Sequence, residues 1–285
     1  MDIATIKALH AKHGRNMALI VNHSGGKDSH RMLGYLVEHF PEITKYVVQA
    51  DTGFEQVAPI SAEDFARQNV ARYGLKLYMV KTPNKTYLSM VEKRRKFPDM
   101  IRRQCTSDLK RGPVEVFMRN TGRAKFHSPV REKVLINCLG IRAAESPKRS
   151  AMTPWKLDEK LSIAGRKVWN WMPIFQETLR DVLEWHWRVG HPLHPVYVPE
   201  YHADGTQGGY MRRLSCRLCI FATEHDIKMV AKHDPEAFYA VANLEQRINF
   251  TMRPDRKTLF QIVGQDTDDG QQYGSEEELP EIPCY

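Results

Sequence analysis

A short loop at residues 22–29 carries the side chains of an anion-binding site. It reads Asn22-His23-Ser24-Gly25-Gly26-Lys27-Asp28-Ser29. The glycine pair allows a tight turn that gathers backbone N–H groups, and a helix starting just after it adds a positive dipole. Lys27 supplies a full positive charge, Ser24 and Ser29 supply hydroxyls, and Asp28 is a candidate Mg²⁺ ligand. The spacing differs from the G-x-x-x-x-G-K-[ST] pattern, which disfavours a P-loop kinase or GTPase. A plain Gly-Gly turn with solvated Lys27 and Asp28 is the alternative.

Three cysteines have spacings that suit metal or redox chemistry. Five cysteines in 285 residues are too few for a disulfide framework, whereas Cys216-Arg217-Leu218-Cys219 has the C-x-x-C spacing of metal and redox sites. Cys105 lies in the separate segment Arg102-Arg103-Gln104-Cys105. A buried C-x-x-C without metal, with Cys105 as a small apolar side chain, is the alternative. Cys138 lies in an apolar run and is expected in the core.

Alternating strand and helix signals predict the scaffold that positions the loop. Apolar runs at residues 17–21, 46–48, 75–80 and 134–139 are typical of buried parallel strands. Helices are predicted at residues 28–39, before Pro41, and at residues 60–73, closed by Gly74. This alternation predicts an α/β fold, a doubly wound parallel sheet with helices on both faces.

The sequence changes character after Trp169. An aromatic-rich helix is predicted at residues 178–189, the C-x-x-C pair follows, and one or two helices are predicted between residues 224 and 250. We therefore expect an α/β domain over residues 1–168, a helical, loop-rich C-terminal part over 169–264 and an acidic flexible tail over 265–285. The twelve histidines are expected mostly at the surface. Four tryptophans are expected to pack in the core and against helices, and they are Trp169, Trp171, Trp185 and Trp187.

The charge distribution suits a polyanionic ligand. All 42 Lys and Arg residues precede Gln265, whereas seven of the 34 acidic residues follow it, so residues 1–264 carry a formal charge of +15. A body this basic favours nucleotides, sulfonucleotides or a nucleic acid. No apolar run approaches the roughly 20 residues that cross a bilayer, and the first residues lack the apolar core of a secretory signal. We expect a cytoplasmic protein with no membrane partner.

Several segments together resemble one known family. Ser24-Gly25-Gly26-Lys27-Asp28-Ser29 is similar to the SGGxDS loop of the PP-loop ATP pyrophosphatases, which have the adenine nucleotide alpha-hydrolase-like fold. Asp51-Thr52-Gly53 resembles the DTG of the phosphoadenosine phosphosulfate (PAPS) reductase family, and residues 140–149 resemble its G-x-R-x-x-E-S-x-x-R segment. Pro173-Ile174 with Asp181-Val182, and His194-Pro195-Val196-Tyr197, resemble two further family motifs. The matches cover about residues 15 to 223 in the family's order.

The resemblance implies an adenine nucleotide at the loop. The residues that would bind it are Ser24, Gly25, Gly26, Lys27, Asp28, Ser29, Asp51, Thr52, Gly53, Gly140, Arg142 and Arg149. Adenine would sit against the second strand, and Arg142 and Arg149 would reach phosphate or sulfate. Lys27, Asp28 and Arg142 are the expected catalytic residues, with ATP and Mg²⁺ as the expected ligands. Without the resemblance, the alternative is that Arg142 and Arg149 are ordinary surface cations.

The resemblance also implies a role for the cysteines. Iron–sulfur members of the family use a Cys-Cys pair at the earlier position and C-x-x-C at the later one. Gln104 stands where the first cysteine of that pair falls, so Cys105, Cys216 and Cys219 match and one ligand is missing. Three thiolates hold a [4Fe–4S] cluster with one iron open, as in some sulfur-inserting enzymes of this type. Zinc and bare thiols are the alternatives.

Three functions remain open. The first is an ATP pyrophosphatase that adenylates an acceptor, such as tRNA or DNA, and supports sulfur transfer from a donor such as a cysteine desulfurase. The second is a PAPS or APS (sulfonucleotide) reductase with a thioredoxin-like electron donor. The third is a nucleotide- or nucleic-acid-binding module without chemistry. The lysine-bearing loop favours the first, as does the lack of the reductases' C-terminal E-C-G-[IL]-H motif, because Cys284 in Pro283-Cys284-Tyr285 lacks those neighbours.

Overall fold

The chain folds into two compact units, each assembled from three segments. The structure is a computed structural model that describes residues 3–57, 60–124, 132–197, 200–201, 207–208, 213–214 and 216–264. Unit 1 comprises Met1–Ala50, Ala62–Val80 and Gly112–His194, and unit 2 comprises Asp51–Ser61, Lys81–Arg111 and Pro195–Tyr285. The predicted tail at residues 265–285, with Cys284, lies outside the described residues. Among the described residues, no helix is long and apolar enough to cross a membrane.

Unit 1 is built on a six-stranded sheet with the order β3-β2-β1-β4-β6-β5. Its strands are β1 (Met17–Asn22), β2 (Thr44–Asp51), β3 (Leu77–Lys81), β4 (Lys133–Cys138), β5 (Trp155–Leu157) and β6 (Arg166–Trp171). β2, β1, β4 and β6 run parallel, whereas the edge strand β5 pairs antiparallel with β6. The predicted α/β fold is therefore confirmed, although neither β6 nor the antiparallel edge strand β5 was predicted. The division predicted at residue 168 falls inside β6.

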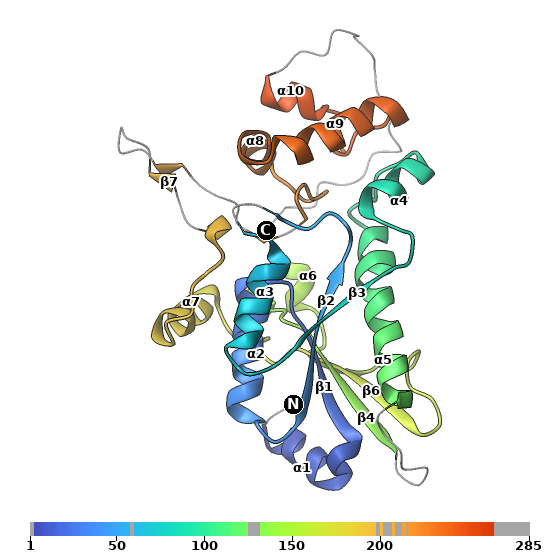
Figure 1. Ribbon diagram of the computed structural model, residues 1–285, viewed down its shortest axis with the longest axis vertical. Coiled ribbons are helices and arrows are strands. Elements are labelled where there is room, and N and C mark those ends of the chain that lie inside the picture. Colours follow the sequence, from blue (N-terminus) through green and yellow to red (C-terminus); the bar gives the residue numbers. More distant parts are fainter. Residues whose placement is uncertain are drawn as a thin grey trace. The chain divides into compact units, whose positions relative to one another are not determined.

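Helices cover both faces of this sheet. On one face, β1 residues Leu19 and Val21 pack with Met32, Leu33 and Leu36 of α2 (Lys27–His39) and with α3 (Ala62–Ala71). On the other face, Ala18 and Ile20 pack with Val114 and Met118 of α5 (Gly112–Ala124). Successive strand residues point to opposite faces, so an uninterrupted apolar run serves both cores. Unit 1 also contains α1 (Ile3–His13), η1 (Gly14–Asn16), η3 (Ala143–Glu145), α6 (Pro147–Ser150) and α7 (Leu179–Arg188) (Figure 1).

Unit 2 is mainly helical and has its own apolar core. It contains α4 (Tyr87–Arg94), the π-helical segment η2 (Thr106–Arg111), η4 (Pro195–Tyr197), the short pair β7 (Glu200–Tyr201) and β8 (Gln207–Gly208), α8 (Glu224–His233), α9 (Pro235–Ile248) and α10 (Leu259–Val263). Phe54, Tyr87, Leu218 and Phe238 are buried in one cluster, so all three segments of the unit contribute to this core. One or two helices were predicted between residues 224 and 250, and the structure has two there, α8 and α9. Thr223 and Asp234 cap their N-termini.

Some expectations for aromatic and histidine residues were wrong. Trp171 and Trp185 are buried, but Trp187 is 84% exposed on α7 and packs in no core. Several histidines that were expected at the surface are buried, namely His13, His23, His30, His186 and His194. The residue type alone does not predict whether a histidine is buried, because a neutral imidazole can be packed inside a protein.

Close packing between α2 and α7 supports the start of α2. Gly34 lies on α2 where an added Cβ would come within 2.1 Å of a ring carbon of Trp185. The Trp185 ring cannot simply move, because it contacts His30 and His186 at centroid distances of 5.5 and 4.9 Å. The glycine is therefore required by the tryptophan that packs on it.

We expect Gly34→Ala to destabilise the protein by about 1–3 kcal/mol through overpacking. This reverses the gain of roughly 1 kcal/mol that alanine gives at an unhindered helix position. Urea unfolding measures the change. Gly34→Ala combined with Trp185→Leu should lose less than the two single effects added together, and simple additivity would contradict the proposed contact.

Candidate functional site

The loop after β1 turns three consecutive backbone N–H groups toward side-chain acceptors. Ser24 N–H donates to Ser29 Oγ at 3.2 Å, Gly25 N–H donates to His23 Nδ1 at 3.1 Å, and Gly26 N–H donates to Ser24 Oγ at 3.4 Å. Ser29 Oγ in turn donates to Gly26 O at 2.8 Å. These neutral acceptors occupy the donors that an anion would use at a helix start.

Glycine is required at two positions around this loop. Gly25 has φ +79, a left-handed conformation that other residues rarely adopt. Gly140, in the loop after β4, lies so close to α2 that an added Cβ would be 3.1 Å from Ser29 Cα and 3.2 Å from Asp28 O. The loops after β1 and β4 therefore pack directly against each other.

These two loops meet where the strand order of the sheet reverses. The chain runs outward from β1 to β2 and β3 on one side, and β4, β6 and β5 lie on the other. Ligands of open α/β sheets bind outside the carboxyl ends of the strands at this reversal. The predicted residues Ser24–Ser29, Gly140 and Arg142 all lie there.

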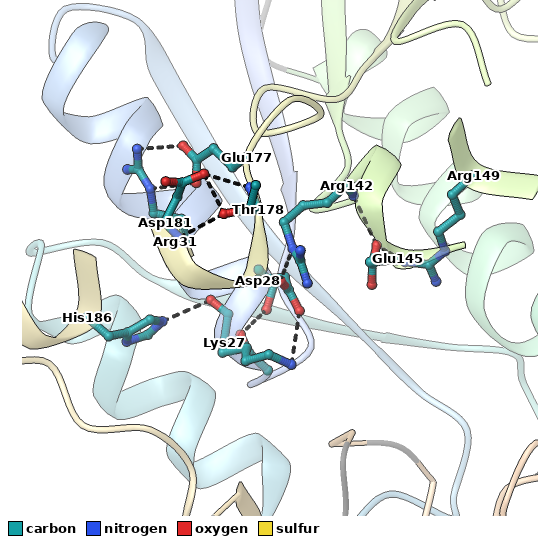
Figure 2. Close-up of polar contacts among 12 residues, drawn as sticks. Lys27, Asp28, Arg31, Arg142, Glu145, Arg149, Glu177, Thr178, Asp181 and His186 are labelled. Carbon is teal, nitrogen blue, oxygen red and sulfur yellow. Dashed lines mark hydrogen bonds and ion pairs between the residues drawn. The ribbon is translucent and has the colours of Figure 1, made fainter. Parts of the chain in front are cut away.

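Asp28 is held between two cations, as Figure 2 shows. Arg142 Nε donates to Asp28 Oδ1 at 2.6 Å, and Lys27 Nζ lies 3.4 Å from Asp28 Oδ2. Arg142 is only 4% exposed, so its guanidinium is a buried charge that needs this carboxylate. The sequence predicted all three residues as site residues, and the structure brings them together. The sequence did not predict that Asp28 would pair with Arg142.

Arg149 lies one ion pair further along the same loop. Its guanidinium pairs with Glu145, and the other contact of Glu145 is with the backbone N–H of Arg142 at 2.9 Å. Arg149 is therefore linked to Arg142 through Glu145 (Figure 2). Glu145 neutralises the charge of Arg149, whereas Lys27 and Arg142 share the single carboxylate of Asp28. Arg149 therefore adds less net positive charge to this site.

A histidine from α7 contacts the first turn of α2. His186 Nε2 lies 3.0 Å from Lys27 O, and its Nδ1 lies 3.3 Å from His191 O. Burial lowers the pKa of His186, so the neutral ring donates through one nitrogen, and the shorter contact favours Lys27 O. α7 itself is fixed nearby, because Arg31 of α2 binds Glu177 through two bonds of 3.0 and 2.6 Å.

A row of amides that was not predicted crosses the carboxyl ends of three strands. Asn22 Nδ2 donates to Asn137 Oδ1 at 2.7 Å, Asn137 Nδ2 to Asn170 Oδ1 at 2.7 Å, and Asn170 Nδ2 to Asp158 Oδ2 at 3.1 Å. A carboxylate accepts hydrogen bonds, so Asp158 at the end fixes the direction of the whole row. Asn22 and Asn137, at the ends of two predicted strands, were the available signal, whereas the strand that carries Asn170 was not predicted.

The predicted turn Asp51-Thr52-Gly53 belongs to unit 2 and is held by its own hydrogen bonds. Gly53 N–H donates to Asp51 Oδ1 at 2.7 Å. The backbone N–H and the hydroxyl of Thr52 both donate to Glu55 Oε1, at 2.9 and 2.6 Å. Burial raises the pKa of Glu55, and these bonds oppose that rise.

The three predicted cysteines are all in unit 2, and backbone contacts fix one of them beside this turn. Cys216 forms an isolated antiparallel bridge with Glu55, and Arg217 N–H donates to Phe54 O at 2.9 Å. Burial raises the pKa of the Cys105 thiol and that of the Cys219 thiol, the latter to about 12, and the negative charge of Cys216 adds to both shifts. The three sulfurs therefore lie within electrostatic reach of one another.

Two further side chains face these sulfurs. The exposed Lys110 has its pKa raised, chiefly by the negative charge of Cys216. The Tyr87 hydroxyl is buried without a hydrogen-bond partner in the described part of the chain. Its pKa is raised by burial and then by the charges of Cys219, Cys216 and Cys105. A positive charge and an unused O–H donor suit a sulfur-rich anionic group at this position.

The described residues nevertheless contain no group of three His, Cys, Asp or Glu side chains arranged to hold a metal ion. The chemistry of the donors fits an iron–sulfur cluster, and the metal site stays a prediction. We call Cys105, Cys216, Cys219, Lys110 and Tyr87 the cysteine centre.

An α/β sheet with a glycine-containing loop at the reversal of its strand order defines the class of this protein. Within that class, the chain belongs to the phosphoadenosine phosphosulfate reductase domain family, whose model matches residues 18–219. It is 26% identical over 284 residues to an uncharacterized 37.8 kDa protein of Escherichia phage 186, covering 85% of this chain and 78% of that protein. Among solved structures it is similar to a phosphoadenylyl-sulfate (PAPS) reductase from Candida auris in a phosphate complex. The identity is 13%, the TM-score 0.43, and the coverage 68% of this chain and 83% of that one.

Buried histidines next to the loop give unit 1 a dependence on pH. Burial lowers the pKa of His23 to about 3. Burial, together with the positive charges of His23, His186, His191 and Arg72, lowers the pKa of His30 to about 2. Both rings are neutral in the folded protein at neutral pH, whereas the unfolded chain binds protons below about pH 6.5. Their contribution to stability is therefore complete above pH 6.5 and is lost as the pH falls toward 3.

Between pH 7.5 and 5.5 we expect each of these two histidines to cost about 1.4 kcal/mol of stability. Urea unfolding at the two pH values measures the loss. His30→Phe should reduce that loss by about the contribution of one histidine, whereas His225→Gln, at an exposed position in unit 2, should leave it unchanged. An identical pH effect in wild type and His30→Phe would contradict the assignment.

Proposed function

We propose that the protein binds ATP with Mg²⁺ at the loop after β1 and uses it to adenylate an acceptor. The acceptor oxygen attacks the α-phosphorus, and pyrophosphate leaves. A hydrosulfide-level sulfur nucleophile then displaces AMP, so sulfur takes the place of the activated oxygen. The observation that carries this proposal is the loop itself, where three consecutive N–H donors precede α2 and where Lys27 and Arg142 flank Asp28.

The charges around Asp28 suit a nucleotide that brings a metal ion with it. Lys27 and Arg142 provide two positive charges for phosphate oxygens, and one carboxylate lies between them. Asp28 Oδ2 is the oxygen that would bind Mg²⁺, after Lys27 turns from it toward the phosphates. The metal ion would neutralise phosphate charge as pyrophosphate leaves.

The cysteine centre is the proposed site of a [4Fe–4S] cluster. Cys105, Cys216 and Cys219 would hold it, Tyr87 O–H would donate to one of its sulfurs, and Lys110 would offset its negative charge. With three protein ligands, one iron stays open, and the cluster would supply a place to bind the incoming sulfur.

A sulfonucleotide reductase is the second candidate, and membership of the PAPS reductase domain family favours it. The sulfate of a sulfonucleotide would bind the same cations. The reduction needs a thiol nucleophile and an electron donor such as thioredoxin. Cys284 is the only thiol in residues 265–285, and the sequence there lacks the motif that places such a thiol in reductases.

Removing the Lys27 charge is expected to weaken ATP binding by about 1.5–3 kcal/mol, which is roughly ten- to 150-fold. Calorimetry with ATP, PAPS and AMP measures the effect on Lys27→Ala. Lys7→Ala, an exposed lysine on α1, is the matched control and should bind like wild type. Tighter binding of PAPS than of ATP, with no pyrophosphate released from ATP, would establish the reductase instead.

Asp28→Asn separates the role of the metal ion from that of the cations. It removes a negative charge beside the phosphates, so ATP binding without Mg²⁺ should become tighter. The gain in affinity on adding Mg²⁺ should disappear. Persistence of that gain in Asp28→Asn would show that Asp28 does not hold the metal ion.

Serine at Cys105, Cys216 or Cys219 should each remove most of the iron from anaerobically purified protein, together with a broad absorbance near 400 nm. The controls Cys138→Ala, in the β4 core, and Cys284→Ser should keep normal iron content. Full metal content in Cys105→Ser would rule out a three-cysteine site. A colourless wild type with stoichiometric zinc would favour zinc, and activity lost in Cys284→Ser with iron retained would favour the reductase.

A further inference from the structure

Unit 2 carries a concentrated run of positive charge that the proposed chemistry has not used. Residues 93–103, here called the basic segment, follow the body of α4 and end two residues before Cys105. They contain six cations and a single acidic residue, Asp99. Four of these cations are exposed, namely Lys93, Arg94, Arg95 and Arg102.

The nearby carboxylates do not neutralise this charge. Glu92 lies 3.4 Å from Arg247 of α9, which packs beside α4 in Figure 1. Asp99 Oδ1 accepts the backbone N–H groups of Ile101 and Arg102, at 2.9 and 2.5 Å. Asp108 binds Lys85 at 2.6 Å. Across the described residues, none of the four exposed cations forms an ion pair.

The backbone holds one of these charges at a position that usually carries glycine or asparagine. Arg95 ends α4 in the left-handed conformation, with φ 53. Two other helices of unit 2 also end in this conformation, and there the residues are Asn249 and Gly264. Those are the residue types that adopt it at little cost. An arginine here keeps a positive charge where the local backbone favours a different residue.

The basic segment is tied to both cysteine-bearing stretches. The Arg103 guanidinium lies 4.7 Å from the centroid of the Phe221 ring, and Arg103 Nε donates to Met100 O at 3.1 Å. Arg103 precedes Cys105 by two residues, and Phe221 follows Cys219 by two. A polyanion bound along this segment would therefore lie at the cysteine centre.

We propose that the basic segment binds the phosphodiester backbone of a nucleic acid. Repeated phosphates match several uncompensated cations on one short stretch, and such contacts depend on charge rather than on base sequence. The exposed Ile101, between the two groups of cations, offers an apolar contact to a sugar or base. The role of this nucleic acid as the acceptor rests on the proposed function, but its binding does not.

The test measures binding of labelled 20-nucleotide single-stranded DNA, the matching RNA, and duplex DNA to the full-length chain over a range of salt. The segment variant replaces Lys93, Arg94, Arg95 and Arg102 with glutamine. The control variant makes the same charge change in unit 1, at the exposed residues Lys7, Lys12, Arg15 and Arg188.

The segment variant should lose more than tenfold in affinity at 150 mM salt. The slope of log affinity against log salt concentration should become shallower by roughly three to four units. The control variant should lose much less. The tighter of RNA and DNA identifies the acceptor class.

Equal losses in the two variants, or no binding by wild type, would overturn the proposal. Competition by polyglutamate as strong as that by unlabelled nucleic acid would overturn it in favour of an acidic protein partner. ATP affinity, measured in parallel, should be the same in both variants and wild type. Nucleic acid bound through the segment by a protein that does not bind ATP would uphold this inference and refute the proposed function.

Discussion

The buried ion pair between Asp28 and Arg142 is the interaction on which the candidate nucleotide site depends. It joins the loops after β1 and β4, whose paired residues are 114 positions apart in the chain. A guanidinium that is 4% exposed would cost several kcal/mol without a partner, so the pair holds both loops in place as long as the sheet is folded. Gly140 permits this close approach, because any side chain there would press on the first turn of α2. An incoming phosphate competes with Asp28 for Arg142, and a metal ion on Asp28 would relieve that competition.

Local sequence patterns were sufficient to predict β1, β4 and α2, which flank this site. The apolar run at residues 17–21, the glycine pair and the following amphipathic stretch correspond to β1, the loop and α2. Each of these signals is contained in a few consecutive residues, so the periodicity of apolar residues and the turn-forming residues can be recognised without the tertiary structure. The antiparallel edge strand β5 has only three residues, too few for a period to be visible. Contiguous motifs of the resembled family supplied most of the candidate site residues.

The contacts that give these residues their chemistry depend on the tertiary structure. Nothing in the sequence near Asp28 indicates Arg142 as its partner. Nothing near Tyr87 indicates that its buried hydroxyl has no hydrogen-bond partner among the described residues. His186 was one histidine among twelve until α7 placed it 3.0 Å from Lys27 O. The prediction that Trp187 packs in the core was wrong, because Trp187 lies on the exposed face of α7, opposite the buried Trp185. The spacing of apolar residues predicts that one face of a helix is buried. When aromatic residues lie on both faces, as on α7, only the neighbouring element shows which face that is.

The hydrogen bonds inside the free loop determine what kind of ligand it can select. Ser24, Gly25 and Gly26 already donate their N–H groups to two hydroxyls and an imidazole. A ligand therefore exchanges hydrogen bonds at the loop, and a neutral ligand gains almost nothing from the exchange. Ionised phosphate oxygens form charge-assisted bonds about twice as strong as neutral ones, and they also attract Lys27 and Arg142. A ligand at this loop would therefore be selected by charge, and each additional ionised phosphate group would strengthen binding more than any neutral group of similar size.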